Sequence, residues 1–192
     1  MRATADKRTE TIRYLHLLDG GGDLEFGDLV GLAAEICDIP FAGVGVFAED
    51  TYHFLAAKNI QVRSIPKSNS FCALVLDGGV PVEIADTHED LRSKDSPLVK
   101  EGLRLRFYYG YPLVLADGEI IGALCVMDQR PRKLTDLQKN AVTTLARQVV
   151  THFERRRAEM ILNQQRAAIA SSAKLSALGE MAAGIAHEIN NP

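Results

Sequence analysis

The residue of this sequence with the clearest chemical potential is His187, which lies near the C-terminus and is followed directly by a carboxylate, Glu188. Apolar residues recur around it at intervals of three and four, which indicates a helix that buries one stripe. The heptad defined by this stripe places His187 away from the seam, so we expect a solvated imidazole. Such a ring can act as a nucleophile, and Glu188 can take up its proton or orient it.

The surrounding segment, residues 174–192, ends in His-Glu-Ile-Asn-Asn-Pro. It resembles, without gaps, the phosphoacceptor box of bacterial sensor histidine kinases. The resemblance implies that His187 attacks the γ-phosphate of ATP and carries the phosphoryl group. It also implies that Glu188 assists the transfer and that Asn191 positions water or partner groups when the phosphoryl group is later removed. The plainer alternative is an exposed helix histidine followed by a chance acid.

The sequence stops at Pro192, where the helical hairpin of that family would continue. It contains no GxxxxGK[ST] phosphate-binding loop. We therefore expect ATP to act as phosphodonor through a separate ATP-binding catalytic domain, and the chain alone not to autophosphorylate. The resemblance implies an aspartate of a response regulator as the next phosphate acceptor.

Composition narrows the remaining possibilities. The 192 residues carry a formal net charge of −3 with scattered Lys and Arg, which does not suggest a nucleic-acid surface. No apolar run has the ~18–20 residues of a membrane span, and no signal-peptide core is present, so we expect a cytoplasmic protein. Cys37, Cys72 and Cys125 are far apart in apolar sequence, which favours reduced, buried thiols and no metal site.

The positioning elements can be predicted from periodicity and turn residues. We expect a helix over 12–18 before the glycines at 20–22, and a second helix over 26–37. The remaining expectations are a hairpin of 42–47 with 52–57, a short helix over 70–76, a strand over 81–85, a turn of helix after Pro97, a hairpin of 105–115 with 119–127 around Asp117-Gly118, and a helix from Leu134.

This order resembles a GAF domain, a small sensory fold. The similarity rests on Ser70-Phe-Cys-Ala73, on the segments 84–90 and 105–113, and on 118–128 followed by Leu-Thr-Asp-Leu-Gln at 134–138. It implies an α+β fold with a central antiparallel sheet flanked by helices, followed here by a long C-terminal coiled-coil helix.

We divide the chain into an N-terminal polar and helical segment (1–23), a GAF sensory domain (24–155), a helical linker (156–173) and the truncated start of the phosphoacceptor domain (174–192). No proline interrupts residues 135–189, and helical patterns of this length usually form coiled coils.

Two apolar phases follow each other along that helix. Leu137, Ala141, Leu145, Val149 and Phe153 step by four. The later heptad has Ile161, Ala168, Leu175 and Ala182 at its a positions and Gln164, Ser171, Leu178 and Ile185 at its d positions. An exposed stripe of this kind predicts a parallel homodimer. The weak middle of the seam either lets a sensory domain bias the packing by rotation or register, or merely weakens a constitutive dimer.

The ligand of the sensory domain cannot be read from the sequence. Members of the family bind cyclic nucleotides, bilins, haem or small metabolites, and some bind nothing. Cys72 invites comparison with bilin-binding members, but Ala73 follows it where those commonly have histidine, and the imidazoles of His53 and His88 are more typical of surface or satisfied histidines than of haem ligands. If a small-molecule pocket exists, its candidate contacts are Cys72, Asp86, Asp90, Arg92 and Tyr109.

Strand alternation places Phe107, Tyr109 and Tyr111 on one face and Tyr108 on the other, without showing which face holds the pocket. Two function classes remain. The first is a sensor histidine kinase in which the GAF domain controls His187. The second is a non-enzymatic dimeric GAF module that organises partners and carries a vestigial box.

Overall fold

A computed structural model describes residues 2–20 and 22–189, with the side chains of 7–20, 24–172 and 174. The chain separates into two units, Met1–Glu154 and Arg155–Pro192. The first unit contains the sheet and all but one of the described helices in full, and the second contains the C-terminal part of the last helix.

Six antiparallel strands form one sheet at the centre of the first unit. They are β1 (Phe41–Ala48), β2 (Thr51–Lys58), β3 (Ser64–Pro66), β4 (Val82–Ile84), β5 (Phe107–Val114) and β6 (Ile120–Asp128). Their order is β3-β2-β1-β6-β5-β4, so the last strand of the sequence pairs with the first. The two central strands, β1 and β6, are buried along nearly their whole length. Helices must therefore cover both faces of the sheet.

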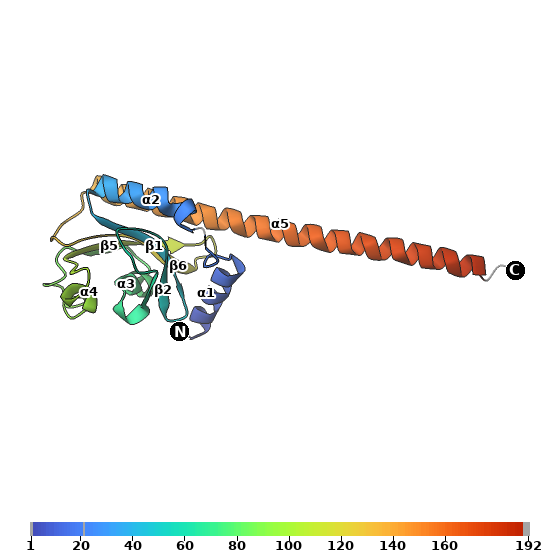
Figure 1. Ribbon diagram of the computed structural model, residues 1–192, viewed down its shortest axis with the longest axis horizontal. Helices are drawn as coiled ribbons and strands as arrows, with labels where there is room; N and C mark the ends of the chain where they lie inside the picture. Colours follow the sequence, from blue (N-terminus) through green and yellow to red (C-terminus); the bar gives the residue numbers. More distant parts are fainter. Residues whose placement is uncertain (1, 21, 190–192) are drawn as a thin grey trace. The chain divides into compact units, whose positions relative to one another are not determined.

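One face is covered by α2 (Gly22–Cys37) and by the beginning of α5 (Asp136–Ile189), which lie side by side in Figure 1. The ring of Phe26 in α2 meets that of Phe153 in α5 edge-on, with centroids 5.5 Å apart. Edge-on aromatic pairs contribute about 0.5–1.5 kcal/mol beyond the burial of their area. This contact joins the two helices into one layer.

The apolar stripe predicted at the start of α5 is wrong at Leu137, whereas Ala141 is half-buried and Leu145, Val149 and Phe153 are buried. Leu137 is 77% exposed, whereas Val142 and Ala146 are buried together with Val149 and Phe153. A step of four residues turns about 40° beyond a full helical turn, so it leaves the buried face after a few repeats. The observed stripe alternates steps of three and four and stays on that face.

The opposite face carries the 3₁₀ turn η1 (Lys67–Asn69), α3 (Cys72–Gly78) and α4 (Pro97–Lys100). A cluster of buried side chains fills the space between these elements and the sheet. Its aromatic and sulfur-containing members are Phe47, Tyr52, Phe71, Cys72, Tyr108, Cys125 and Met127. Cys37, Cys72 and Cys125 are free and buried, as expected.

The first helix, α1 (Arg2–Tyr14), begins earlier than the sequence pattern suggested and ends before Leu15. Tertiary bonds explain its position. Arg8 Nε donates to Phe47 O (2.9 Å), and Thr11 Oγ1 donates to Glu119 Oε2 (2.9 Å). These side chains tie a polar segment, which lacks a strong apolar period, to β1 and to the start of β6.

The α+β fold expected from the resemblance is confirmed: a central antiparallel sheet lies between helices and is followed by a long C-terminal helix. The hairpin around Asp117-Gly118 is present, and Gly118 has a positive φ of 82° there. The strand β3 was not expected. It has only three residues at the edge of the sheet, which is too short to leave a visible period.

In the second unit, α5 continues from Arg155 to Ile189. The side chains of residues 161–172 are all exposed, including Ile161, Leu162 and Ile169. Within the residues that the structure describes, no helix has the length and apolar character needed to cross a membrane.

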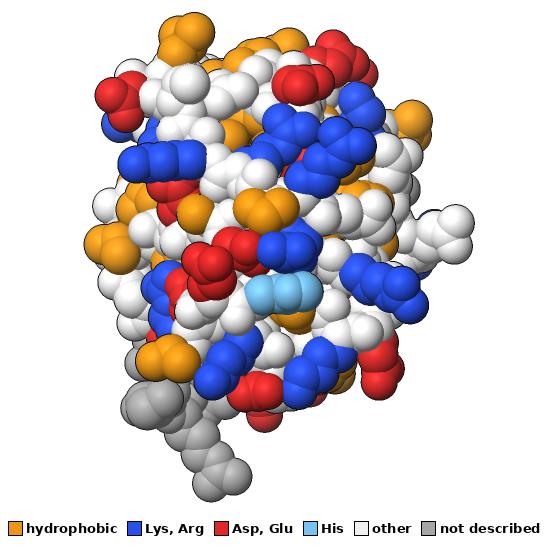
Figure 2. Space-filling model, turned by 90° about the vertical axis from the view of Figure 1, so that its left-hand side faces the viewer, with side chains coloured by type: hydrophobic (Ala, Val, Ile, Leu, Met, Phe, Trp, Pro, Cys, Tyr) orange, Lys and Arg blue, Asp and Glu red, His pale blue; other side chains and the backbone are white. Residues whose placement is uncertain are grey.

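Basic and acidic side chains are interspersed on the face of the molecule in Figure 2. Charges of opposite sign also form ion pairs among the described residues, such as Lys100 with Asp95 (2.9 Å) and Arg92 with Asp90 (2.6 Å). This face therefore does not present the single-signed basic field that is typical of nucleic-acid binding.

The close packing around Tyr108 gives a test of the fold. A Cβ added at Gly110 would overlap Tyr108 Oη and lie 2.8 Å from Val75 Cγ2. We expect Gly110→Ala to lower the free energy of unfolding by about 1–3 kcal/mol, measured by urea denaturation. The control is Gly27→Ala on α2, where nothing lies within 4 Å. Gly27→Ala should stabilise by about 0.5–1 kcal/mol. Equal effects of the two substitutions would contradict this packing.

Candidate functional site

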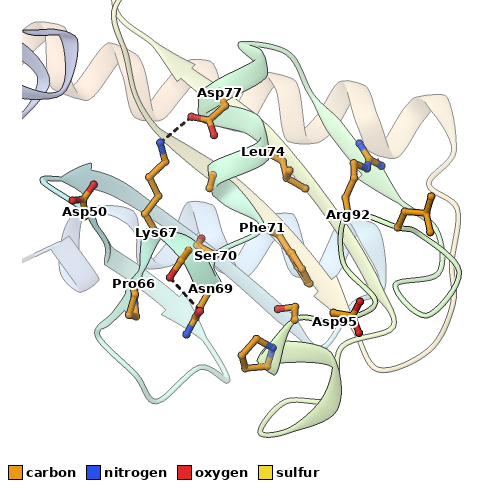
Figure 3. A pocket seen from close by; sticks show the side chains of 15 residues that line it. Asp50, Pro66, Lys67, Asn69, Ser70, Phe71, Leu74, Asp77, Arg92 and Asp95 are labelled. Carbon is orange, nitrogen blue, oxygen red and sulfur yellow. Dashed lines mark hydrogen bonds and ion pairs between the residues drawn. The ribbon is translucent and has the colours of Figure 1, made fainter. Parts of the chain in front are cut away.

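A cavity of about 780 Å³ opens on the face of the sheet that carries α3. One wall comes from residues 66–70, and the floor from Phe71 and from Ala73, Leu74 and Asp77 of α3. The other wall comes from Leu91, Arg92, Asp95, Ser96 and Pro97, and Asp50 also lines the cavity. Figure 3 shows Phe71 and Leu74 between the charged groups of the two walls. This volume falls in the range of about 300–1,000 Å³ that is usual for small-molecule sites.

The first wall is held by the turn that precedes α3. Lys67 N donates to Asp50 O (2.8 Å), which attaches η1 to the β1–β2 turn. Ser70 Oγ accepts from Cys72 N (3.2 Å) and satisfies a backbone donor at the beginning of α3. Lys67 Nζ reaches Asp77 Oδ1 at the far end of α3 (2.8 Å). The Lys67 side chain is therefore fixed along the helix, as Figure 3 shows.

The second wall is a loop held by its own polar residues. Thr87 Oγ1 donates to Leu105 O (2.6 Å), and the buried Ser93 Oγ donates to Thr87 O (2.9 Å). Arg92 forks onto Asp90, with Nε–Oδ1 at 2.9 Å and Nη2–Oδ2 at 2.6 Å. These hydrogen bonds from Arg92 lower the pKa of the Asp90 carboxyl. The loop thus holds the Arg92 side chain at the wall of the cavity in a defined geometry.

The lining is that of a binding site. It combines an apolar floor, the hydroxyls of Ser68, Ser70 and Ser96, and charges of both signs. A ligand can exchange hydrogen bonds with either ion pair, and no metal is required for that. In the part of the chain covered by the structure, no group of three or more His, Cys, Asp or Glu could hold a metal ion.

Of the five candidate ligand contacts predicted from the sequence, Arg92 lines the cavity. Asp90 does not line the cavity but accepts the hydrogen bonds that orient the Arg92 guanidinium. Asp86 is bound by Arg106 through Nε–Oδ1 (2.9 Å) and Nη2–Oδ2 (2.5 Å). The hydrogen bond from Arg106 lowers the pKa of the Asp86 carboxyl to about 2. Asp86 and Asp90 thus orient arginines, and neither lies in the cavity wall.

Cys72 lies below the cavity floor in the core, and its side chain is directed toward Tyr108. It is 3% exposed and accepts a hydrogen bond from Tyr108 Oη (3.3 Å). Burial disfavours the thiolate, but hydrogen bonds with Cys125, Tyr108 and Tyr52 outweigh it and lower the pKa of Cys72 to about 7. Attachment of a chromophore at this sulfur would require the core to open.

Tyr109 lies on the face of the sheet opposite the cavity. Lys139 Nζ of α5 is 6.0 Å from the centre of its ring, and burial raises the pKa of its hydroxyl to about 12. Tyr111 is on the same face, next to Arg147 and Val150 of α5, whereas Tyr108 contacts Cys72 on the cavity side. The predicted alternation is confirmed, and the structure shows that the Tyr108 face is the one with the cavity.

Lys67, Asn69, Asp77 and Asp95 also line the cavity, and none of them was predicted from the sequence. Lys67, Asn69 and Asp77 lie close together because the 3₁₀ turn η1 brings residues 67–69 beside α3, which carries Asp77. The only sequence signal was Ser70-Phe-Cys-Ala73, which marked the start of α3 but not the turn before it.

His187 and Glu188 lie in the last turn of α5, which ends at Ile189, so the predicted helical setting of the histidine is present. Their side chains are beyond the described set, and Asn191 lies outside the described residues. The solvent exposure of His187 and the chemistry of all three residues stay predictions.

Comparison with known proteins identifies the first unit. The sequence model of the GAF domain matches residues 24–153. The chain belongs to the GAF-domain family. It therefore contains a sensory domain of a kind used in signal transduction, and the cavity beside α3 is its candidate ligand site.

A curated relative is a cyclic di-GMP phosphodiesterase of Pseudomonas aeruginosa. It is 34% identical over 125 residues, which cover 65% of this chain and 21% of the relative. The chain thus spans about a fifth of that protein's length. The match concerns one part of a larger enzyme.

Three solved structures show the same fold at low sequence identity. A domain of a protein described as a two-component sensor histidine kinase from Sinorhizobium meliloti has 21% identity and a TM-score of 0.56, covering 73% of this chain and 97% of that one. The GAF domain of an Acinetobacter phosphoenolpyruvate-protein phosphotransferase has 15% identity and a TM-score of 0.58 (79% and 96%). Free methionine-R-sulfoxide reductase from Neisseria meningitidis has 15% identity and a TM-score of 0.59 (78% and 89%).

The Asp86–Arg106 pair gives a pH prediction. Because the pKa of Asp86 is lowered to about 2 from an unfolded value of about 3.9, the stabilisation by this pair is complete above pH ~5 and is lost as the pH falls through 4 toward 2. Arg106→Ala should return the Asp86 pKa toward its ordinary value, read from carboxyl ¹³C shifts in an NMR titration. Arg104→Ala is the control and should leave it low. An unchanged Asp86 pKa in Arg106→Ala would show that Arg106 is not the cause.

Proposed function

We propose that this chain is the sensory and phosphoacceptor portion of a two-component sensor histidine kinase. One observation carries the proposal. The helix α5 packs in the GAF domain through Val149 and Phe153 and continues to Ile189, so it includes residues 174–189 of the box that resembles a phosphoacceptor site. The sensory domain and His187 therefore share a helix, which supports direct control of one by the other.

In the proposed reaction, an imidazole nitrogen of His187 attacks the γ-phosphorus of ATP. A P–N bond forms, the bond to the ADP oxygen breaks, and Glu188 takes up the proton that the ring releases. ATP is presented by a catalytic domain beyond the residues of this chain. The phosphoryl group then passes to an aspartate of a response regulator, and Asn191 positions water or partner groups when it is removed. Both ATP and the regulator place this chemistry in the cytoplasm.

The active form in this proposal is a parallel homodimer. Ile161, at an a position of the predicted seam, is 44% exposed on the described part of α5 beyond the GAF domain, and in the sequence the seam continues through Leu175, Leu178 and Ile185. An apolar seam of this kind is stabilised when a second helix covers it. A small molecule in the cavity beside α3 would be the input, and its binding would shift the population of dimer packings.

The phosphoacceptor role is tested with a matching ATP-binding domain supplied in trans. We expect γ-labelled ATP to phosphorylate the wild-type chain and to leave His187→Gln unlabelled, since an amide cannot form the phosphoramidate. His88→Gln, in an exposed loop, serves as the control and should label like the wild type. The label should be lost in acid and kept in base. Equal labelling of His187→Gln would remove His187 from this role.

A second candidate is a non-enzymatic dimeric GAF module with a vestigial box. One observation favours it: the curated relative shares a related stretch of sequence but is described as a phosphodiesterase. GAF domains of this type thus occur in proteins with other outputs. In that case the chain would still dimerise, but no ATP-binding domain of the kinase type would label it.

The dimer seam gives a separate test. Leu178→Asp and Ile185→Asp would each place a charge in the seam, and an unpaired buried charge costs several kcal/mol. We expect the dimer dissociation constant to rise on the order of 100-fold, measured by sedimentation equilibrium. Ser176→Asp, at a heptad position outside the seam, should leave the constant unchanged. If the seam variants stay fully dimeric at low concentration, surfaces of the GAF domain hold the dimer instead.

A further inference from the structure

The edge strand β4 lies between the cavity and the start of α5. Val82 and Ile84 are buried in the same core cluster as Phe71, which forms the cavity floor. Successive side chains of a strand point to opposite faces, so Glu83 is directed toward the α5 side. This three-residue strand pairs with β5 alone. A small shift of β4 therefore disturbs few backbone hydrogen bonds.

The carboxylate of Glu83 holds the beginning of α5. Its Oε1 accepts from Leu134 N (2.9 Å), and its Oε2 pairs with Lys139 Nζ (2.5 Å). The Glu83 and Lys139 side chains are 21% and 29% exposed, so water only partly screens their attraction. Hydrogen bonds to a charged group are stronger than neutral ones. Glu83 therefore fixes both the entry and the first turn of α5.

These contacts are not needed to cap the helix. Thr135 N donates to Gln138 Oε1 (3.0 Å) and Gln138 N donates to Thr135 Oγ1 (3.3 Å), which is a complete capping box. Gln138 Nε2 also donates to Ile36 O of α2 (3.2 Å). Since the helix start is satisfied locally, the bonds from Glu83 act as an anchor between α5 and β4.

The same strand is tied to the cavity wall. Arg92, which lines the cavity and forks onto Asp90, also directs Nη2 toward Glu83 O at 3.5 Å. On the other side of the strand, Arg132 N donates to Ala85 O (3.0 Å) just before α5. A continuous series of contacts thus runs from the cavity through β4 to the start of α5.

We propose that Glu83 is the positioning residue that couples the GAF cavity to α5. A ligand that engages Arg92 or the floor at Phe71 shifts β4, and the Glu83 carboxylate transmits the shift to Leu134 and Lys139. This inference rests on the proposed function, in which the cavity is the input and α5 leads to His187. It adds the residue through which the input reaches the helix.

The test is amide hydrogen exchange, followed by NMR on the full chain, in the wild type, Arg92→Ala, Glu83→Gln and the double variant. Arg92→Ala removes the wall contact and should speed exchange at Leu134 and residues 139–142 about threefold or more. Glu83→Gln should speed it about tenfold by removing the charged anchor. In the double variant we expect the rates of Glu83→Gln alone, because the route from Arg92 is then already broken.

Two controls separate coupling from general loosening. Lys67→Ala changes the opposite wall, where the lysine pairs with Asp77, and Glu35→Gln removes a carboxylate on α2 that pairs with Lys58. Both should leave exchange at the start of α5 unchanged. The inference is overturned if Arg92→Ala has no effect there, or if the effects of Arg92→Ala and Glu83→Gln simply add, as they would for two independent structural roles. No phosphotransfer is measured, so failure here is distinct from failure of the kinase proposal.

Discussion

The packing of α5 against α2 and the sheet is the interaction on which the rest of the structure depends. Val142, Ala146, Val149 and Phe153 are buried in this layer. A helix of a few turns is marginal in water, and burial of each large apolar side chain contributes about 1.5–3 kcal/mol. The buried stripe therefore both closes one face of the sensory domain and sets the rotation of α5 about its own axis. Because the same helix includes His187, that rotation is the quantity that a sensory input alters in the proposed mechanism.

The sheet separates the cavity from the layer formed by α2 and the beginning of α5. Its α3 side holds the cavity and a core with Tyr52, Cys72 and Tyr108, and its other side holds α2 and the beginning of α5. The central strands β1 and β6 are buried on both faces and paired along their length, so a displacement of either would break many packing contacts and hydrogen bonds. In the proposed mechanism, a signal from the cavity to α5 passes around these strands at an edge of the sheet. The short strand β4 is such an edge, and Glu83 is the side chain that reaches from it to α5.

The sequence predicted those parts of the fold that depend on local pattern. The hairpin at Asp117-Gly118, the helix that ends at Cys37 and the alternation of Tyr108 and Tyr109 all follow from turn chemistry and from the period of two or 3.6. Leu137 was misassigned because a step of four drifts around a helix. The strand β3 was missed because three residues at an edge carry no period.

The cavity was harder to predict because its walls come from segments far apart in the sequence. Arg92 was anticipated, but Lys67 and Asp77 meet across a helix whose preceding turn has no sequence signature. Asp86 and Asp90 were predicted as ligand contacts, but the carboxylate of each accepts hydrogen bonds from an arginine of the protein itself. Cys72, on α3, faces the core. Tyr109, on β5, faces α5, a choice that strand alternation alone leaves open.

The central claim is that the GAF domain controls His187 through the rotation of α5, and the length of that helix tests it most directly. Two residues inserted after Gln164 turn everything beyond them by about 200°, whereas seven residues return it to within about 20°. The initial rate of phosphorylation by an added ATP-binding domain would be compared between the two chains. The account predicts a rate within about twofold of the wild type for seven residues and a change of roughly tenfold or more for two, since small misplacements of reacting groups cost large factors in rate. Equal rates in the two chains would contradict it.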